Sequence, residues 1–233
     1  MTTHTNKRLP RGTLSQELIV AAALHVADAS GVEKLTFQAL GRELSAHPTS
    51  VYRHFQNKDA LILALVDALH AEALAQMPPR SDDWAEDLMQ IALHTHAAFM
   101  RHPRVGAIAA PRTARREHEF QSVEWKIDCM RRAGLEEHDA ARYYRVFGDL
   151  VLSYSAMDAA RTLLDPTILA GDDLSWHVDY QTQPRDRFPN IAFLSPYFCD
   201  VTDPENFRVA VQCVIDAIRY RATSTHEEAA RRK

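Results

Sequence analysis

The sequence predicts an all-α protein, and three observations point to that fold class. Glycine and proline are scarce, with 7 and 11 of 233 residues, whereas the helix formers Ala, Leu, Glu and Arg are abundant. Apolar residues recur three or four positions apart along most of the chain, which is the spacing of one helix face. No stretch alternates between apolar and polar residues with the period of two that a half-buried strand needs.

The composition indicates a globular protein of the cytoplasm. Apolar residues make up 46% and charged residues 25% of the chain, values typical of a protein with a real core. The first residues contain no apolar core of a signal peptide, and no uncharged apolar run approaches the roughly 18 residues of a membrane span. Three widely spaced cysteines, Cys129, Cys199 and Cys213, favour reduced thiols over disulfides.

Charge is distributed unevenly along the chain. The net charge is −4, but residues 1–58 hold seven Lys/Arg against four Asp/Glu. The remaining residues hold 20 basic and 27 acidic side chains. This asymmetry indicates a small basic module, able to face phosphates, attached to a larger acidic one.

Four helices are expected in the basic module and the segment that follows it. Ser15 caps the first, over 15–30, and Thr36 caps a short second helix, "FQALGREL". After a break at Ser45 a third helix is expected over 47–55, and a longer fourth one from Asp59 to the Pro78-Pro79 stop. The acidic half shows helical periodicity in further segments, separated by a long Pro- and Asp-rich connection at 165–203. These segments are 84–101, 112–133, 137–164 and 205–221.

The stretch "HPTSVYRHFQNK", residues 47–58, has the chemistry of a DNA-reading helix. Val51 and Phe55, four residues apart, would be buried against the preceding helices. The opposite side presents short hydrogen-bonding groups and a cation, which suit base edges and phosphates in a major groove. An amphipathic surface helix with a polar outer face is the competing interpretation. The outward residues are Thr49, Ser50, Tyr52 and Arg53, with His54 at the flank.

The segment "LTFQALGRELSAHPTSVYRHFQNKDALILAL" closely resembles the DNA-binding domain of the tetracycline-repressor (TetR) family, over residues 13 to about 70. Spacing and identity agree across three elements. Two positions depart from the family pattern. Ser45 stands where the family usually has Gly, so a positive φ there would cost on the order of 1 kcal/mol. His47 stands where a capping Ser often lies. The matching residues are Thr36, Ala39, Leu40, Leu44, Ser50, Val51, Tyr52, His54, Phe55, Lys58, Ala60 and Leu61.

The resemblance implies individual roles in binding a double-stranded operator. Thr49 and Ser50 would lie nearest the bases, with Arg53 as a reader of guanine. Phosphates would be held by Thr36, Tyr52, His54 and Lys58. The basic residues Lys7, Arg8 and Arg11 would form either an arm reaching a minor groove or a disordered tail.

The larger half resembles the C-terminal domain of tetracycline repressors around "DDWAEDLMQIALHTHAAFMRHP", residues 82–103. That resemblance implies an unknown small-molecule effector and a homodimer reading palindromic half-sites. Two helices with wide apolar faces, near 137–164 and 205–221, would form the dimer as a four-helix bundle. The expected parts are a flexible basic arm (1–12), a helix-turn-helix domain (13–58), a connecting helix (59–77), an effector-binding and dimerisation domain (78–221) and a disordered tail (222–233).

Candidate effector contacts are aromatic or polar-tipped residues on the middle helices, and a core or interface role is the competing account for each. Residues 165–203 would either fold over the pocket entrance or remain a disordered loop. The candidates are His94, Phe99, Met100, Trp125, Cys129, Tyr143, Phe147 and Tyr154.

Two other functions compete with this prediction. A metal or hydrolytic enzyme is disfavoured because His94 and His96 would lie on opposite sides of a helix, and no GxSxG elbow, phosphate loop or CxxC pair occurs. We therefore expect no catalytic residue, metal or cofactor. An architectural DNA-binding protein without an effector is disfavoured by the size and acidity of residues 78–233.

Overall fold

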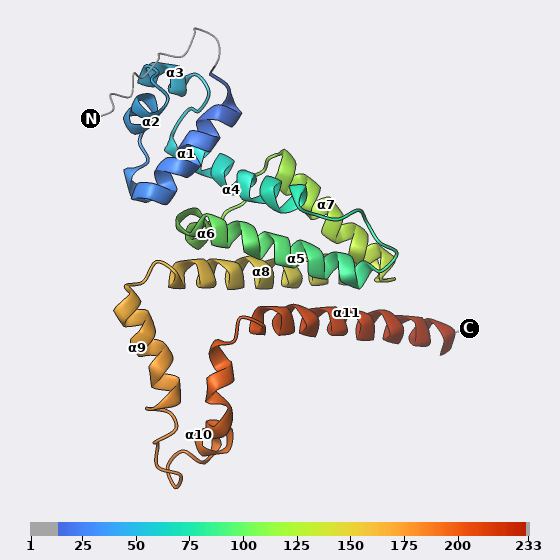
Figure 1. Ribbon diagram of the computed structural model, residues 1–233. Coiled ribbons are helices and arrows are strands. Elements are labelled where there is room, and N and C mark those ends of the chain that lie inside the picture. Colours follow the sequence, from blue (N-terminus) through green and yellow to red (C-terminus); the bar gives the residue numbers. More distant parts are fainter. Residues whose placement is uncertain (1–13, 232–233) are drawn as a thin grey trace.

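The structure, a computed structural model, describes residues 14–231 and contains no strand within that range, which confirms the all-α fold class. Four helices form the N-terminal part (Figure 1). They are α1 (Gln16–Ser30), α2 (Phe37–Glu43), α3 (Pro48–Tyr52) and α4 (Lys58–Ala75), with the 3-10 turn η1 (Val32–Lys34) between the first two. The basic arm expected at 1–12 lies outside the described residues.

The C-terminal part contains the remaining helices, and α5 has the bounds that the sequence predicts. They are α5 (Trp84–Arg101), α6 (Pro103–Ala109), α7 (Glu117–Arg132), α8 (Glu137–Arg161), α9 (Pro166–His177), α10 (Pro189–Leu194), the 3-10 segment η2 (Ser195–Thr202) and α11 (Asn206–Arg231). Helices α5, α7, α8 and α11 form the body of this part, and α11 lies along α5 and α8 (Figure 1).

Side-chain caps begin the N-terminal helices. The Ser15 hydroxyl accepts a hydrogen bond from the Leu18 amide at 3.2 Å, and the Thr36 hydroxyl accepts one from the Ala39 amide at 3.0 Å. Asn57 caps α4 by accepting from the Ala60 amide at 2.8 Å. Each cap satisfies an amide that has no partner within its helix.

Helix α4 joins the two halves through a shared core. Leu61 and Leu65 are fully buried among the apolar side chains of α1, α2 and α3. The same cluster includes Phe99 of α5 and Val105 of α6, with exposures of 2% and 0%. The core of the N-terminal half therefore continues into the C-terminal half through α4.

Four predicted helix bounds differ from the structure by three residues or more, and one of them is the end of α8, at Arg161 rather than 164. The helix expected over 112–133 begins at Glu117, and α6 precedes it from Pro103. A proline fits the first turn of a helix, where its missing N–H is not needed, and Pro103 begins α6 in this way. Helix α3 ends at Tyr52 rather than 55, and α11 continues to Arg231 through most of the expected disordered tail.

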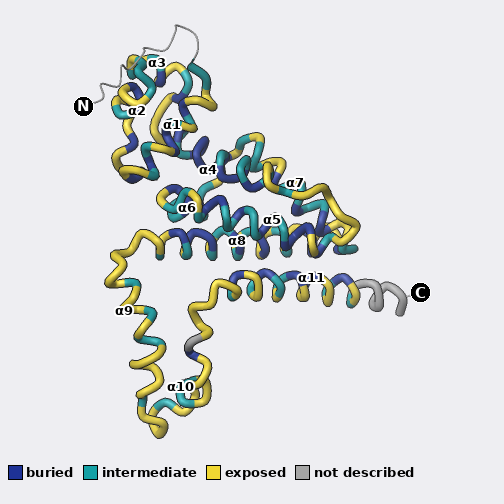
Figure 2. The backbone as a smooth tube through the Cα atoms, viewed as in Figure 1, coloured by how far each residue is buried: buried dark blue, intermediate teal, exposed yellow. Residues whose placement is uncertain are grey.

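The connection 165–203 is neither a cover over the body nor a structureless loop. It folds into α9, α10 and η2, which project away from the body (Figure 1). Asp165 caps α9, and Pro166 occupies its first turn. Neither α9 nor α10 has a buried residue (Figure 2). Over residues 14–231 no helix is long and apolar enough to cross a membrane.

Candidate functional site

The third helix is short, has a side-chain cap at its N-terminal end and is anchored by two buried apolar side chains. His47 precedes α3, and its Nδ1 accepts a hydrogen bond from the Thr49 amide at 3.3 Å. The histidine therefore caps the helix in place of the usual Ser. Pro48 occupies the first turn. Val51 and Phe55 are 0% and 1% exposed, as the sequence predicts, and they hold this helix against α1 and α2.

The turn before α3 has the strained conformation expected for a non-glycine residue. Ser45 has φ 49°, in the left-handed region, and its buried hydroxyl has no hydrogen-bond partner. The turn also passes close to α2, because a Cβ on Gly41 would lie 2.8 Å from the carbonyl oxygen of Ala46. Glycine at position 41 therefore sets the spacing of the two helices, whereas position 45 carries strain.

The outward face of α3 is polar. Thr49, Tyr52 and Arg53 are exposed, whereas Ser50 and His54 are half-buried. The Thr49 hydroxyl lies 2.7 Å from Nδ1 of His47, so this hydroxyl has a local partner as well as an open side. No hydrogen bond or ion pair holds the Arg53 guanidinium among the residues that the structure describes.

Three of the predicted phosphate contacts meet at one hollow. Thr36, Tyr52 and Lys58 line a depression of about 330 Å3 beside α3. The Tyr52 ring packs edge-on against Phe37 with centroids 4.3 Å apart, which fixes its direction. The Lys58 ammonium donates to the carbonyl oxygen of Glu33 at 3.3 Å, and its two other N–H groups can donate elsewhere.

The predicted effector residues are not brought together at one cavity. Phe99 belongs to the core around α4, whereas Cys129 and Phe147 are fully buried in the body core, where burial raises the pKa of the Cys129 thiol to about 11. His94 and Met100 are half-buried. Tyr143, Tyr154 and Trp125 pack against the body core, and Trp125 also lines a cavity of about 580 Å3 between α4 and α7.

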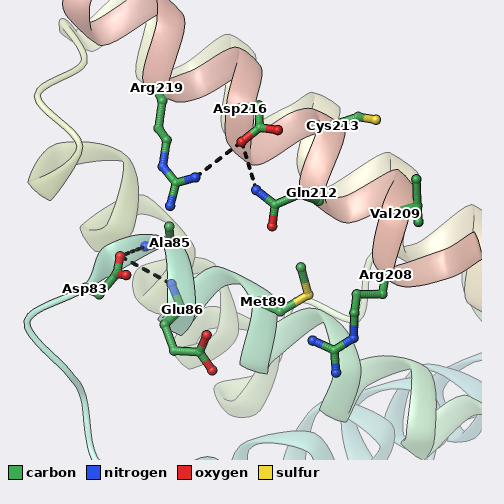
Figure 3. A pocket seen from close by; sticks show the side chains of 10 residues that line it. All are labelled: Asp83, Ala85, Glu86, Met89, Arg208, Val209, Gln212, Cys213, Asp216 and Arg219. Carbon is green, nitrogen blue, oxygen red and sulfur yellow. Dashed lines mark hydrogen bonds and ion pairs between the residues drawn. The ribbon is translucent and has the colours of Figure 1, made fainter. Parts of the chain in front are cut away.

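A second depression, of about 470 Å3, lies between the beginning of α5 and α11 (Figure 3). Its charged groups already have partners: Asp83 caps α5, and Asp216 accepts from Gln212 at 2.8 Å and from Arg219 at 3.2 Å. None of the predicted effector residues lines it. This depression therefore lacks unpartnered polar groups that would orient a ligand.

A buried polar cluster was not predicted. His70 on α4 and Lys126 on α7 are both 6% exposed. Desolvation by burial lowers the pKa of His70 to about 4, with the Lys126 charge adding to that effect, and it lowers the pKa of Lys126 to about 8. The sequence held one signal, because Lys126 lies four residues after Ser122 and three before Cys129, on an otherwise inward-facing side of a helix.

A histidine bridge connects the two halves beside α4. His102, between α5 and α6, contacts Asp28 of α1 through Nδ1 and Glu72 of α4 through Nε2, both at 2.7 Å. Its side chain is 17% exposed. Each ring nitrogen thus lies within hydrogen-bond distance of a carboxylate, one on α1 and one on α4.

The histidines do not form a metal centre in the part of the chain that the structure describes, which holds no group of three or more potential ligands. His96 contacts Asp158 at 2.8 Å and stacks on Phe207. His94 is half-buried and makes no such contact.

A trihelical head with an outward polar third helix, joined through α4 to a helical body, defines the chain as a helix-turn-helix DNA-binding protein. The sequence family described as "Bacterial regulatory proteins, tetR family" matches residues 19–65. "Tetracyclin repressor-like, C-terminal domain" matches residues 77–220. The chain therefore belongs to the TetR family, which consists of DNA-binding transcriptional regulators rather than enzymes and whose members bind DNA operators and form dimers.

Similar proteins include regulators from several bacteria. An HTH-type transcriptional regulator of Saccharopolyspora erythraea is 28% identical over 127 residues, covering 54% of this chain and 53% of the relative. The class G tetracycline repressor of Vibrio anguillarum is 31% identical over 121 residues, covering 52% and 55%. The chain thus spans about half the length of these relatives.

The fold extends further than the sequence similarity. The structure of apo ActR from Streptomyces coelicolor superimposes with a TM-score of 0.79, at 22% identity, over 91% of this chain and 98% of ActR. ActR in complex with actinorhodin superimposes with a TM-score of 0.77, at 23% identity, over 90% and 98%. The arrangement of head and body is therefore shared with a regulator that has been solved with a small molecule bound.

Proposed function

We propose that this chain is a transcription regulator that binds a palindromic operator as a homodimer and is released by a small molecule, and thus acts as a repressor in the cytoplasm. The observation that carries the proposal is the outward face of α3, where an unpaired Arg53 stands beside exposed hydroxyls. Thr49, Ser50 and Arg53 would contact base edges. Thr36, Tyr52, His54 and Lys58 would hold phosphates and set the position of the helix.

The dimer would form through α8 and α11. Val146 and Met157 on α8 are 48% and 54% exposed, and they are eleven positions apart, so they lie on one line of the helix. Val209 and Tyr220 on α11 have the same separation and are 58% and 77% exposed. Two such apolar lines would be covered if the helices of two subunits packed as a four-helix bundle.

Release would follow from linkage between the body and the head. A small molecule that binds one arrangement of the body more tightly must change DNA affinity by the same coupling factor. Helix α4 shares its core with both halves, and Glu72 at its C-terminal end is tied to Asp28 of α1 through His102. These contacts would pass a displacement of α4 to the head.

Fluorescence anisotropy tests the proposal. The purified protein is titrated onto labelled duplex DNA from upstream of its own gene, over a series of salt concentrations, with random duplex as competitor. A specific regulator would bind its operator at least about 10³-fold more tightly than random DNA. Equal affinity for both duplexes at every salt concentration would contradict operator recognition. If specific binding occurs but no small molecule reduces it or raises the melting temperature, effector control fails while DNA binding stands.

A further inference from the structure

The polar cluster between α4 and α7 is flanked by buried apolar residues. His70 is followed on α4 by Ala73, and Lys126 is followed on α7 by Cys129 and Met130, all of them buried. Ser122, one helical turn before Lys126, is 1% exposed. A lysine placed this deep costs free energy unless something compensates its charge.

Nothing in the described part of the chain supplies that compensation through a hydrogen bond. Nδ1 of His70 and the hydroxyl of Ser122 are buried without any hydrogen-bond partner. The Lys126 ammonium forms no hydrogen bond or ion pair with a described residue. Most buried polar groups are hydrogen-bonded, so two unsatisfied atoms beside a buried lysine, on two facing helices, need an explanation.

The two nearby carboxylates are already occupied. Asp67 contacts Nδ1 of His118 at 2.9 Å and accepts from the Glu119 amide at 2.9 Å. Glu119 accepts from the amides of Ala114 and Arg115 at 3.1 and 2.6 Å, which fixes it at the start of α7. Lys126 is therefore left with the long-range attraction of Glu119, not with a salt bridge.

We propose that Lys126, Ser122 and His70 form the anion-binding end of the effector site and that the effector carries a carboxylate. This inference rests on the proposed function, because it identifies the chemical class of ligand to which the regulator responds. The ammonium and the hydroxyl would donate to the carboxylate oxygens, and the imidazole would donate from Nδ1 in the matching tautomer. A carboxylate is acceptor-only and takes several such donors at once.

A depression lined by both apolar and polar side chains lies between the same two helices as this cluster. It measures about 580 Å3 and is lined by Leu74, Arg80, Phe120, Gln121, Glu124 and Trp125; His70, Ser122 and Lys126 lie outside this lining. Leu74 lies one turn after His70, and Trp125 directly precedes Lys126. The buried Nε1 of Trp125 also lacks a partner. The body of a ligand would occupy this depression, and its carboxylate would reach inward between α4 and α7 to the cluster.

The site would act on DNA binding through α4. His70 lies in the C-terminal half of α4, two positions before Glu72, whereas the N-terminal part of this helix packs in the head core. A carboxylate that draws His70 and Lys126 together would reposition α4 relative to α7. That displacement would reach the head through the shared core.

The test compares aromatic carboxylates with their neutral amides. Thermal shifts are measured with 2-naphthoate and 2-naphthamide, and with further acid and amide pairs of increasing ring number. Wild type is compared with Lys126→Met, which keeps the length of the side chain and removes the charge. Arg131→Met, on the exposed side of the same helix, is the matched control. Salt-dependent operator binding of each variant is measured separately.

Carboxylates should bind wild type and Arg131→Met at least about tenfold more tightly than their amides, and Lys126→Met should lose that preference, since a hydrogen bond to a charged group is lost. The ligand-free Lys126→Met protein should melt no lower than wild type and bind the operator equally well. Equal shifts with acids and amides, no shift with any acid, or a preference that survives in Lys126→Met would overturn the assignment. A melting temperature several degrees below wild type would make Lys126 a structural residue and also overturn it. Loss of operator binding by wild type itself would instead contradict the proposed function.

Discussion

Replacing Ser45 by Gly should stabilise the protein, because the residue carries two separate costs. Its φ of 49° places a side chain in the left-handed region, which costs roughly 1 kcal/mol for a residue with a Cβ. Its hydroxyl is buried without a partner, which costs about a further 1 kcal/mol at the low end of such penalties. Glycine removes both costs, so that Ser45→Gly should raise the free energy of unfolding by about 2 kcal/mol.

The variant Ser45→Ala separates the two contributions. Alanine removes the hydroxyl and keeps the strained φ, so it should recover at most about half of the gain. Chemical denaturation of the three proteins measures these differences, and in a chain of this size about 1 kcal/mol corresponds to roughly 2–4 °C in melting temperature. If Ser45→Gly were no more stable than Ser45→Ala, the left-handed conformation would carry no cost and the reasoning would be refuted.

Three other predictions concern histidines and the dimer. His70 has a pKa lowered to about 4, so between pH 4 and 6.5 the unfolded chain binds a proton at this residue and the native state does not. Stability should therefore rise by about 3 kcal/mol as pH increases from 4 to 6.5, and urea titrations of His70→Gln should show a flatter rise. His102→Gln should lower the free energy of unfolding by about 1–2 kcal/mol, because the contacts with Asp28 and Glu72 are lost. The control His94→Gln should change it by under about 0.5 kcal/mol, and equal effects of the two variants would contradict the role of the bridge. Met157→Glu should produce monomers in analytical ultracentrifugation, because a charge would be buried in the proposed interface; an unchanged dimer would place the interface elsewhere.

Local signals in the sequence predicted most of the head. Ser15 and Thr36 cap their helices as expected, and Val51 and Phe55 are buried as their spacing requires. The positive φ of Ser45 was also predicted, because the family pattern places glycine there. In each case residues within one or two helical turns determine the conformation, so the information is present in a short stretch.

Features that depend on contacts between distant segments were not predicted. The His102 bridge joins residues that are 74 and 30 positions apart, and no local pattern indicates such a contact. The burial of Lys126 is not predictable from the sequence, because a lysine is usually exposed and only the packing of α4 against α7 buries this one. The candidate effector residues share a chemical type, aromatic or polar-tipped, but type does not show whether they line one cavity. In the structure they are divided between two separate cores.

The central claim is that α3 and its flanks read DNA, and a comparison of Arg53→Ala with Lys58→Ala tests it most directly. Both variants remove one cation from the head. Anisotropy is measured on the operator, on operators substituted at single base pairs and on random DNA, over a range of salt concentrations. We predict that Arg53→Ala costs about 1–3 kcal/mol and abolishes preference at one base pair, whereas Lys58→Ala weakens all duplexes alike and lowers the salt slope by about one. Equal losses on every duplex for both variants would contradict the assignment of Arg53 as a base reader, and no loss for either would contradict the claim as a whole.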